Sequence, residues 1–518
     1  MTVEGIRRKY VWPALAGLMI AVAAAALRAR HLSAESVWLD EYFSMAHLDA
    51  PNLWRFLSDQ RGENWEMVPL YYALQYGWAQ VFGASPVAVR WLSIFFGAGA
   101  AGLIFSTGRL FFGRVVAVLA GLCMVLSPFQ IFHAQGIRPY SLMALLGALA
   151  LFSLFQACES GRRGWWVVNV TANVLLWWSQ LFGVLALIPQ GVFLLLRRAT
   201  RGRLLAFWAA VHMVMLIPLA LWVRSMNWAP DPSLGRPSWR EFMDVSVRSD
   251  GEYIRWLIGH PDKSREIPLT ALQDWLLDMR GDVETALVRV LLLGAALGLL
   301  WLLIIAVRRR GGRMSNDESR RAFAILLVFL WYAVPLLALY AMALLWKPHS
   351  LQARYVIYAF PGLYLLAGAG VSGLPRPLTR GLFGGALIAL MALQTLMADQ
   401  FPMRTDYLSA ARQLRAEARP GELVIVPDWN DLRVLEFNLG PNDLRITRHD
   451  YPLDAWEFIE TSMARESVVW VMAGTGPEAD EILPRLEQLC RDRDIHFTRT
   501  VYLGMRNLYL YRCASSKQ

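Results

Sequence analysis

Apolar runs of membrane-spanning length recur through most of the chain and constrain its fold more than any other feature. A helix of about 20 apolar residues matches the hydrocarbon thickness of a bilayer. Of the 518 residues, 56% are hydrophobic and 18% are charged, whereas a soluble domain carries about 25% charged residues. The sequence therefore predicts a polytopic α-helical membrane protein.

Basic residues predict how the chain crosses the membrane, because Lys and Arg collect in cytoplasmic loops. Arg7, Arg8 and Lys9 precede the first apolar run, so we expect the N-terminus in the cytoplasm. The run over residues 67–82 is short, and we expect it to lie in the interface or to re-enter. Only then do all the later basic clusters fall in the cytoplasm; these are Arg109/Arg114, Arg162/Arg163, residues 197–203, residues 308–313 and Arg376/Arg380.

The resulting prediction is about eleven spans with an extracytoplasmic C-terminus, over residues 11–29, 87–109, 115–133, 139–157, 165–179, 181–196, 204–224, 286–307, 322–345, 351–372 and 380–398. The stretch 165–196 is too long for one span, and we expect it to break at Ser179-Gln180. Two large loops face outward, at residues 30–86 and 225–285. We expect a multi-pass protein of a bacterial-type inner or plasma membrane. Its net charge of +10 then belongs to its loops, and no nucleic-acid partner is expected.

Residues 399–518 differ from the rest of the chain, because charges are frequent there and apolar stretches are short. The patterns at residues 422–427, 467–472, 496–503 and 507–512 predict strands, whereas residues 403–418 and 478–492 have helical spacing. The chain thus divides into a membrane domain, residues 1–398, and a small extracytoplasmic α/β domain, residues 399–518. Cys490 and Cys513 could pair in that domain if its compartment is oxidising.

An acidic pair, Asp40 and Glu41, follows the first predicted span by a few residues. Carboxylates beside a bilayer are costly unless a function uses them. The alternative is a structural one, since acids also favour the first turn of a helix. A functional carboxylate at this place could accept the proton of an incoming hydroxyl.

The predicted topology brings other polar residues to the same outer face. Arginine suits a phosphate there because its planar fork bonds two oxygens at once, although each arginine could instead snorkel to lipid headgroups. The residues expected to hold a phosphate are Arg90, Arg138, Lys347 and Arg354. Those expected near a sugar or an acceptor are Glu63, Glu66, His133, Tyr140 and Gln180.

Short motifs in a fixed order give the membrane part a family resemblance. Besides the Asp40-Glu41 pair, they are residues 68–72 (VPLYY), 89–93 (VRWLS), 126–132 (LSPFQIF), 138–142 (RPYSL), Arg354-Tyr355 and 361–363 (PGL). Over roughly residues 1–370 the chain resembles the GT-C glycosyltransferases, and within them the protein O-mannosyltransferase and aminoarabinose transferase group.

The resemblance implies an inverting enzyme with a polyprenyl-phosphate sugar as donor and a membrane lipid as partner. It implies Asp40 as general base, supported by Glu41, and arginines that hold the lipid phosphate as it leaves. No tightly bound cofactor is expected, and the use of a divalent metal stays open, as do the sugar and the acceptor.

Two departures from the family pattern bear on this expectation. Relatives commonly carry a Glu two residues before the matching arginine, where this chain has Gly136. They often have a His before the proline of the 68–72 motif, where this chain has Val68. A second acid, if one is needed, must come from elsewhere, and Glu63 and Glu66 are the candidates.

Two other function classes stay open. A transporter or lipid flippase usually shows ionisable groups in mid-membrane. Apart from His212, the predicted span interiors lack them, and we expect His212 to form an interhelical hydrogen bond. A non-catalytic subunit of a glycan assembly complex is the third interpretation, and Gly136 is its best support.

Overall fold

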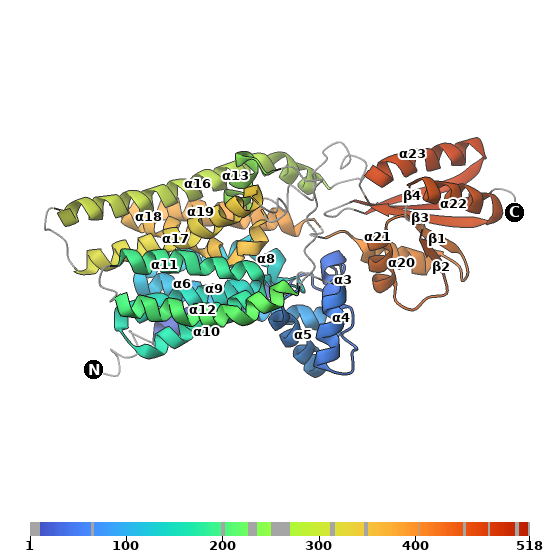
Figure 1. Cartoon of the computed structure of the whole chain (residues 1–518). Helices are drawn as coiled ribbons and strands as arrows, with labels where there is room; N and C mark the ends of the chain where they lie inside the picture. Colours follow the sequence, from blue (N-terminus) through green and yellow to red (C-terminus); the bar gives the residue numbers. More distant parts are fainter. Residues whose placement is uncertain are drawn as a thin grey trace. The chain divides into compact units, whose positions relative to one another are not determined.

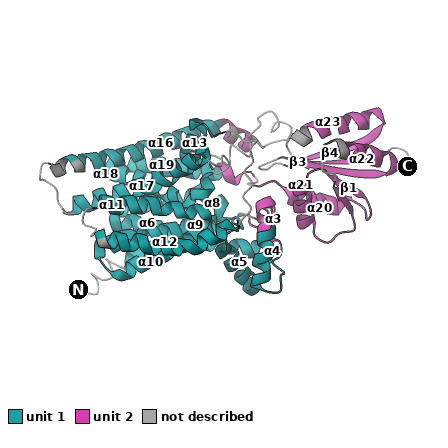
Figure 2. Ribbon diagram, in the orientation of Figure 1, with its two compact units in different colours: residues 1–30, 47–252, 279–396 teal, residues 31–46, 253–278, 397–518 magenta. Residues whose placement is uncertain are grey.

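The computed structural model describes residues 11–63, 67–197, 202–225, 236–249, 270–310, 316–345, 351–401, 404–448, 452–474, 477–502 and 507–515. The chain forms two compact units, which Figure 2 distinguishes by colour. Unit 1 is Met1–Arg30, His47–Glu252 and Met279–Leu396, and unit 2 is His31–Ala46, Tyr253–Asp278 and Met397–Gln518. The sequence predicts one cut after residue 398, whereas the segment that carries Asp40 and Glu41 groups with the C-terminal part.

Unit 1 is built from helices, many of them long and side by side (Figure 1). Its helices before residue 200 are α2 (Trp12–Arg28), α4 (Leu53–Glu63), α5 (Pro69–Phe82), α6 (Pro86–Phe111), α7 (Arg114–Leu126), α8 (Pro128–Ala134), α9 (Tyr140–Ser160), α10 (Arg163–Ser179), η2 (Leu181–Ala186) and α11 (Leu187–Leu196). The later ones are α12 (Gly202–Arg224), α13 (Trp239–Val247), α16 (Ala271–Arg310), α17 (Asn316–Leu345), η4 (Ala353–Ala359), α18 (Phe360–Gly373) and α19 (Pro377–Asp399). The start of α16, up to Asp278, and the end of α19, from Met397, are assigned to unit 2.

Seven helices in the described part of the chain are long and apolar enough to cross a membrane, or eight if the bent pair α7–α8 is one span. Two further apolar helices, Trp12–Arg28 and Leu181–Leu196, are shorter. Helix α5 has 14 residues, a length of about 21 Å that falls short of the roughly 30 Å of a hydrocarbon core. These lengths establish a multi-pass membrane protein, and the count of eleven stays a prediction.

The predicted span 115–133 is not one straight helix, which corrects the sequence analysis. Helix α7 ends at Leu126, α8 begins at Pro128, and the two are bent by 56°. Proline lacks an N–H and its ring clashes with the preceding turn, so a helix breaks in front of it. The Ser127 hydroxyl caps the new helix by accepting from Gln130 N at 3.1 Å, and it also accepts from Tyr364 Oη at 3.1 Å.

A completely buried arginine satisfies the carbonyls that this break leaves without helical partners. Arg28, at the end of α2, donates from Nη2 to Met124 O at 2.7 Å and from Nη1 to Val125 O at 3.5 Å. The Thr395 hydroxyl donates to Leu126 O. A carbonyl in an apolar medium has no water to bond, so these donors permit the helix to stop inside unit 1.

A second break, at Ser179-Gln180, lies where the sequence predicts it, because α10 ends at Ser179 and Gln180 is extended. Near it, a buried polar network joins α10, α11 and α12. Asn173 and Gln190 exchange hydrogen bonds of 2.8 and 3.2 Å, and Asn173 Nδ2 lies 3.1 Å from His212 Nε2. His212 Nδ1 lies 2.7 Å from Trp208 O, so the expected interhelical hydrogen bond of His212 is confirmed.

Unit 2 contains a five-stranded mixed sheet with the order β2-β1-β3-β5-β4. Its strands are β1 (Leu423–Val426), β2 (Arg445–Arg448), β3 (Val468–Gly474), β4 (Ile495–Tyr502) and β5 (Leu508–Ser515). Strands β2, β1 and β3 are parallel, and β5 pairs antiparallel with β3 and β4. The four predicted strands are present, and β2 is an addition.

Helices cover both faces of this sheet (Figure 1): α20 (Tyr407–Glu417) and α21 (Trp429–Leu439), and α22 (Pro452–Arg465) and α23 (Pro477–Asp492). Successive residues of β1 alternate between two cores, because side chains on a strand point to opposite faces. Cys490 and Cys513 are buried in one of these cores as free thiols, with their sulfur atoms 3.7 Å apart. That contact lowers the pKa of the Cys490 thiol and raises that of Cys513.

We predict that Arg28→Met destabilises the protein, because methionine fills space but donates no hydrogen bond to the carbonyls of Met124 and Val125. Each buried group left unsatisfied costs about 1–3 kcal/mol. The unfolding temperature in detergent, followed by tryptophan fluorescence, should therefore fall clearly below that of Arg163→Met, which removes an exposed arginine. Equal unfolding temperatures for the two variants would contradict the bridging role of Arg28.

Candidate active site

The predicted site residues belong to both units. Asp40 and Glu41 lie in unit 2, whereas the residues expected around a phosphate and a sugar lie in unit 1. Three candidates lie outside what the structure describes: Glu66 and Lys347 entirely, and Glu63 for its side chain.

The acidic pair occupies the first turn of a short helix in unit 2, α3 (Leu39–Met45). Trp38 precedes it in extended backbone. Neighbouring residues on a helix point about 100° apart, so the two carboxylates face different surroundings. Asp40 is half-buried, whereas Glu41 is completely buried. Solvent therefore reaches Asp40 in part, whereas Glu41 is enclosed by the surrounding structure.

A buried arginine, Arg404, is the ion-pair partner of the buried Glu41. Arg404 Nη2 lies 3.5 Å from Glu41 Oε1, and Arg404 Nη1 lies 3.8 Å from Glu35 Oε2. A buried carboxylate needs such a partner, because its charge is costly away from water. Arg404 is not among the residues expected from the sequence, because it lies far from Glu41 along the chain and no local pattern connects the two.

Hydrogen bonds from a side chain of α21 and from the backbone of α20 hold the segment that leads into α3. Asn438 accepts from Val37 N at 3.3 Å and donates to Val37 O at 2.9 Å. Leu408 N donates to the Ser36 hydroxyl at 2.8 Å. Tyr42 packs into the core of α20 and α21. These contacts fix the rotation of α3, and with it the direction in which Asp40 can point.

In unit 1, the turn between α8 and α9 carries several of the predicted residues. Gln135 donates from Nε2 to Arg28 O at 3.1 Å and to Arg30 O at 3.0 Å, which ties this turn to the end of α2. Arg138, three residues further on, donates from Nη1 to Tyr72 Oη at 3.3 Å. Gly136, between them, is buried.

The start of α9 connects this turn with η4. The ring centroids of His133 and Tyr140 are 4.7 Å apart. The guanidinium of Arg354 lies 5.8 Å from the Tyr140 ring and 5.5 Å from the Tyr355 ring. The structure therefore brings together residues of α5, the α8–α9 turn, α9 and η4, and we name Tyr72, Arg138, Tyr140 and Arg354 the arginine–tyrosine cluster.

Two other predicted residues, Arg90 and Gln180, are not members of this cluster. Arg90 is completely buried in α6, one turn before Ser93, whose hydroxyl lies 3.0 Å from Tyr71 Oη. Gln180 is half-buried at the break after α10. Phe182, just beyond it, stacks on Tyr355 with a centroid distance of 4.8 Å. In the sequence, Tyr72 and Tyr355 stand out only as parts of motifs, and Phe182 belongs to none of the motifs.

The arginine–tyrosine cluster has the chemistry of an anion site. Guanidinium groups bind phosphate oxygens in pairs, and a tyrosine hydroxyl can add a further hydrogen bond. Stacking against aromatic rings holds an arginine in place at little cost. Among the described residues, no group of three or more His, Cys, Asp and Glu side chains is arranged to hold a metal ion.

Comparison with known proteins finds a family that part of the chain resembles. Residues 67–226 match the family described as dolichyl-phosphate-mannose-protein mannosyltransferase. No curated protein matches the chain significantly.

Two solved structures resemble the whole chain. They are ArnT from Cupriavidus metallidurans in the apo state (TM-score 0.52, 12% identity) and the same protein bound to undecaprenyl phosphate (TM-score 0.51, 13% identity). Each match covers 95% of this chain and 97% of the other. The chain therefore has the fold of ArnT, and it resembles the mannosyltransferase family over residues 67–226.

Proposed function

We propose that the chain is an inverting integral-membrane glycosyltransferase that moves a sugar from a polyprenyl-phosphate donor to an extracytoplasmic hydroxyl. The acceptor, whether protein, lipid or glycan, is left open. The arginine–tyrosine cluster carries the proposal, because two guanidinium groups at one place in the bundle suit a lipid phosphate. The fold shared with ArnT, which binds undecaprenyl phosphate, supports it.

In the proposed reaction, an acceptor hydroxyl attacks the anomeric carbon of the donor sugar. The new bond joins the acceptor oxygen to that carbon, and the bond between the carbon and the phosphate oxygen breaks. The polyprenyl phosphate leaves as an anion, which Arg138 and Arg354 stabilise. Asp40 takes the hydroxyl proton, while Glu41 supports Asp40 from its ion pair with Arg404. Because a phosphate departs without an acid's help, the reaction tolerates Gly136.

We also propose the membrane arrangement that the basic clusters favour. About eleven spans place the N-terminus in the cytoplasm and residues 399–518 outside as a separate α/β domain. This puts the α8–α9 turn and η4 on the outer side, where the acceptor hydroxyl is. No tightly bound cofactor is proposed.

The buried polar network of α10, α11 and α12 argues against a transporter or flippase. Its members in the described structure are two asparagines, a glutamine, a tryptophan and His212, and their hydrogen bonds run to one another and to backbone carbonyls. A transport path usually places ionisable groups where substrate or protons can reach them. This network instead joins helices.

We predict that Asp40→Asn leaves the fold intact but cuts turnover at least about 100-fold, because general-base catalysis contributes about 10²–10⁴-fold. The assay measures release of free polyprenyl phosphate from candidate polyprenyl-phosphate sugars by the purified protein. Asp49→Asn is the matched control, since Asp49 is an exposed aspartate outside α3. Near-normal release by Asp40→Asn would show that the base is misassigned, and absence of release by the unmodified protein would favour a non-catalytic subunit.

Arg138→Ala and Arg354→Ala should each weaken use of the donor. A charge-assisted contact with phosphate is worth about 1.5–3 kcal/mol, or roughly ten- to a hundredfold in affinity. Titration with the donor should show this loss. The control is Arg109→Ala, which changes an arginine in the last turn of α6, outside the arginine–tyrosine cluster, and should bind the donor normally. Similar losses in all three variants would point to a general structural effect of removing arginines.

For Glu41 we predict a positioning role, which a double-mutant cycle can separate from catalysis. Breaking a buried ion pair costs about 3–5 kcal/mol, so Glu41→Gln and Arg404→Met should each lower the unfolding temperature. The double variant should lose less than the two single losses together, because the partners are in contact. Turnover of folded Glu41→Gln should exceed that of Asp40→Asn. Additive stability losses would rule out the coupling.

A further inference from the structure

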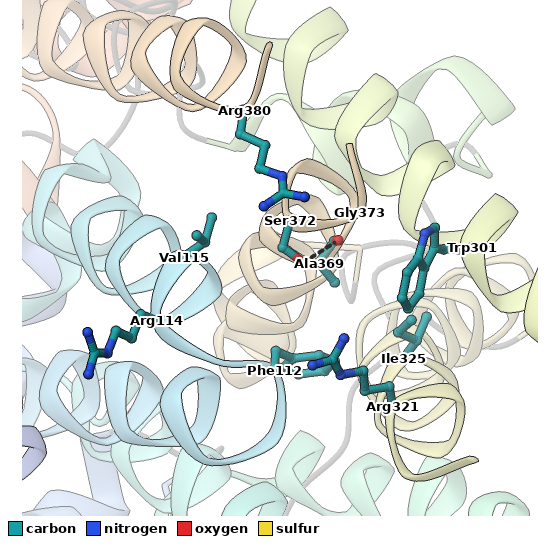
Figure 3. A pocket seen from close by; sticks show the side chains of 10 residues that line it. All are labelled: Phe112, Arg114, Val115, Trp301, Arg321, Ile325, Ala369, Ser372, Gly373 and Arg380. Carbon is teal, nitrogen blue, oxygen red and sulfur yellow. Dashed lines mark hydrogen bonds between the residues drawn. The ribbon is translucent and has the colours of Figure 1, made fainter. Parts of the chain in front are cut away.

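A second basic cavity lies in unit 1, apart from the arginine–tyrosine cluster. It has a volume of about 340 Å³, and we name it the three-arginine pocket after Arg114, Arg321 and Arg380 (Figure 3). Phe112, Trp301 and Ser372 also line it. Helix α18 separates it from the cluster, because η4 with Arg354 precedes this helix and Ser372 lies near its end. The pocket is therefore at the opposite end of the helices.

The charge of this pocket is not neutralised from within. Its lining contains no carboxylate, and none of the three arginines forms an ion pair within the described ranges. The neighbouring Arg320 provides a contrast, since it lies 3.3 Å from Glu159 Oε2. Like charges gathered around a hollow repel one another, so an anion bound there would stabilise this arrangement.

The side chains are arranged to receive such an anion. Figure 3 shows Arg321 and Arg380 directed toward the middle of the pocket, whereas Arg114 points away from it. Arg380 donates from Nε to Leu374 O at 2.5 Å, which holds the side chain in place. The Trp301 ring forms one wall and packs so closely on Gly373 that a Cβ atom there would lie 2.9 Å from the ring.

The position of the pocket in the predicted topology favours one source of the anion. Arg114 and Arg380 belong to basic clusters expected in the cytoplasm, and Arg321 directly precedes the predicted span 322–345 at its expected cytoplasmic end. Exposed apolar side chains lie within two residues of the lining residues Trp301 and Arg380 along α16 and α19: Leu303, Leu378 and Leu382 are 63%, 71% and 66% exposed. A soluble phosphate would use the arginines alone, whereas a phospholipid would also cover these leucines with its acyl chains. Basic pockets between membrane helices on the cytoplasmic side commonly bind anionic headgroups.

We propose that the three-arginine pocket binds the phosphate headgroup of an anionic phospholipid from the cytoplasmic leaflet. A cavity of 340 Å³ is at the small end of ligand sites, which span about 300–1,000 Å³, and it suits a headgroup better than a whole lipid. Bound there, the headgroup joins the α6–α7 turn to α17 and to the α18–α19 turn. The proposal does not rest on the glycosyltransferase activity.

The test compares the unfolding temperature of the full chain in nanodiscs of phosphatidylcholine with and without phosphatidylglycerol. Phosphatidylglycerol should stabilise the unmodified protein, and Arg321→Gln/Arg380→Gln should lose this stabilisation. Arg162→Gln/Arg163→Gln removes the same charge from exposed positions outside the pocket and should keep it. Ser372→Asp keeps the arginines but adds a negative charge to the pocket, so it should also lose the stabilisation by phosphatidylglycerol. This second variant keeps the test valid if Arg321→Gln/Arg380→Gln folds poorly.

Native mass spectrometry then counts bound phosphatidylglycerol, whose affinity should fall at least about tenfold in Arg321→Gln/Arg380→Gln. The proposal is overturned if both double variants respond alike, or if phosphatidylglycerol stabilises no protein. Inorganic phosphate, added to phosphatidylcholine nanodiscs, distinguishes the two sources. Stabilisation by inorganic phosphate that equals the effect of the lipid would overturn the lipid assignment.

Discussion

A helix that stops inside a membrane protein leaves carbonyls that no water can reach, and the bundle of unit 1 depends on how they are satisfied. The break before Pro128 frees the carbonyls at the end of α7, and Arg28 and Thr395 bond them from two other helices. Gly97 makes room for Arg28, because a Cβ atom there would lie 3.2 Å from the Arg28 Nε atom. The same break turns the chain toward the α8–α9 turn, so a structural arginine makes the position of Arg138 possible.

The acidic pair shows how two adjacent, similar side chains acquire different roles. Glu41 is enclosed and paired with Arg404, whereas Asp40 is left half-buried. Buried charge demands a partner, and a base must keep its lone pairs available to an incoming proton. The ion pair therefore serves the proposed chemistry indirectly, because it fixes the rotation of α3 and so the direction of Asp40.

Arginines act in three different ways in this chain, and their surroundings decide which. Arg28 bonds backbone carbonyls, Arg404 neutralises carboxylates, and Arg138 contacts a tyrosine hydroxyl. The arginines of the three-arginine pocket form a further group, since no carboxylate lines that cavity.

The sequence by itself determined the membrane class, the apolar helices, the break at Ser179-Gln180 and the strands of the C-terminal part, because hydropathy and periodicity are local properties. Its motifs also identified Asp40, Arg138 and Arg354 as candidates. Only the tertiary structure decided that the predicted span 115–133 is bent, that Arg28 supports it, and that Arg404 encloses Glu41. Residues 31–46 likewise join the C-terminal part against the sequence-based boundary. These features rest on contacts between residues far apart in the chain, and such contacts leave no periodic pattern along it.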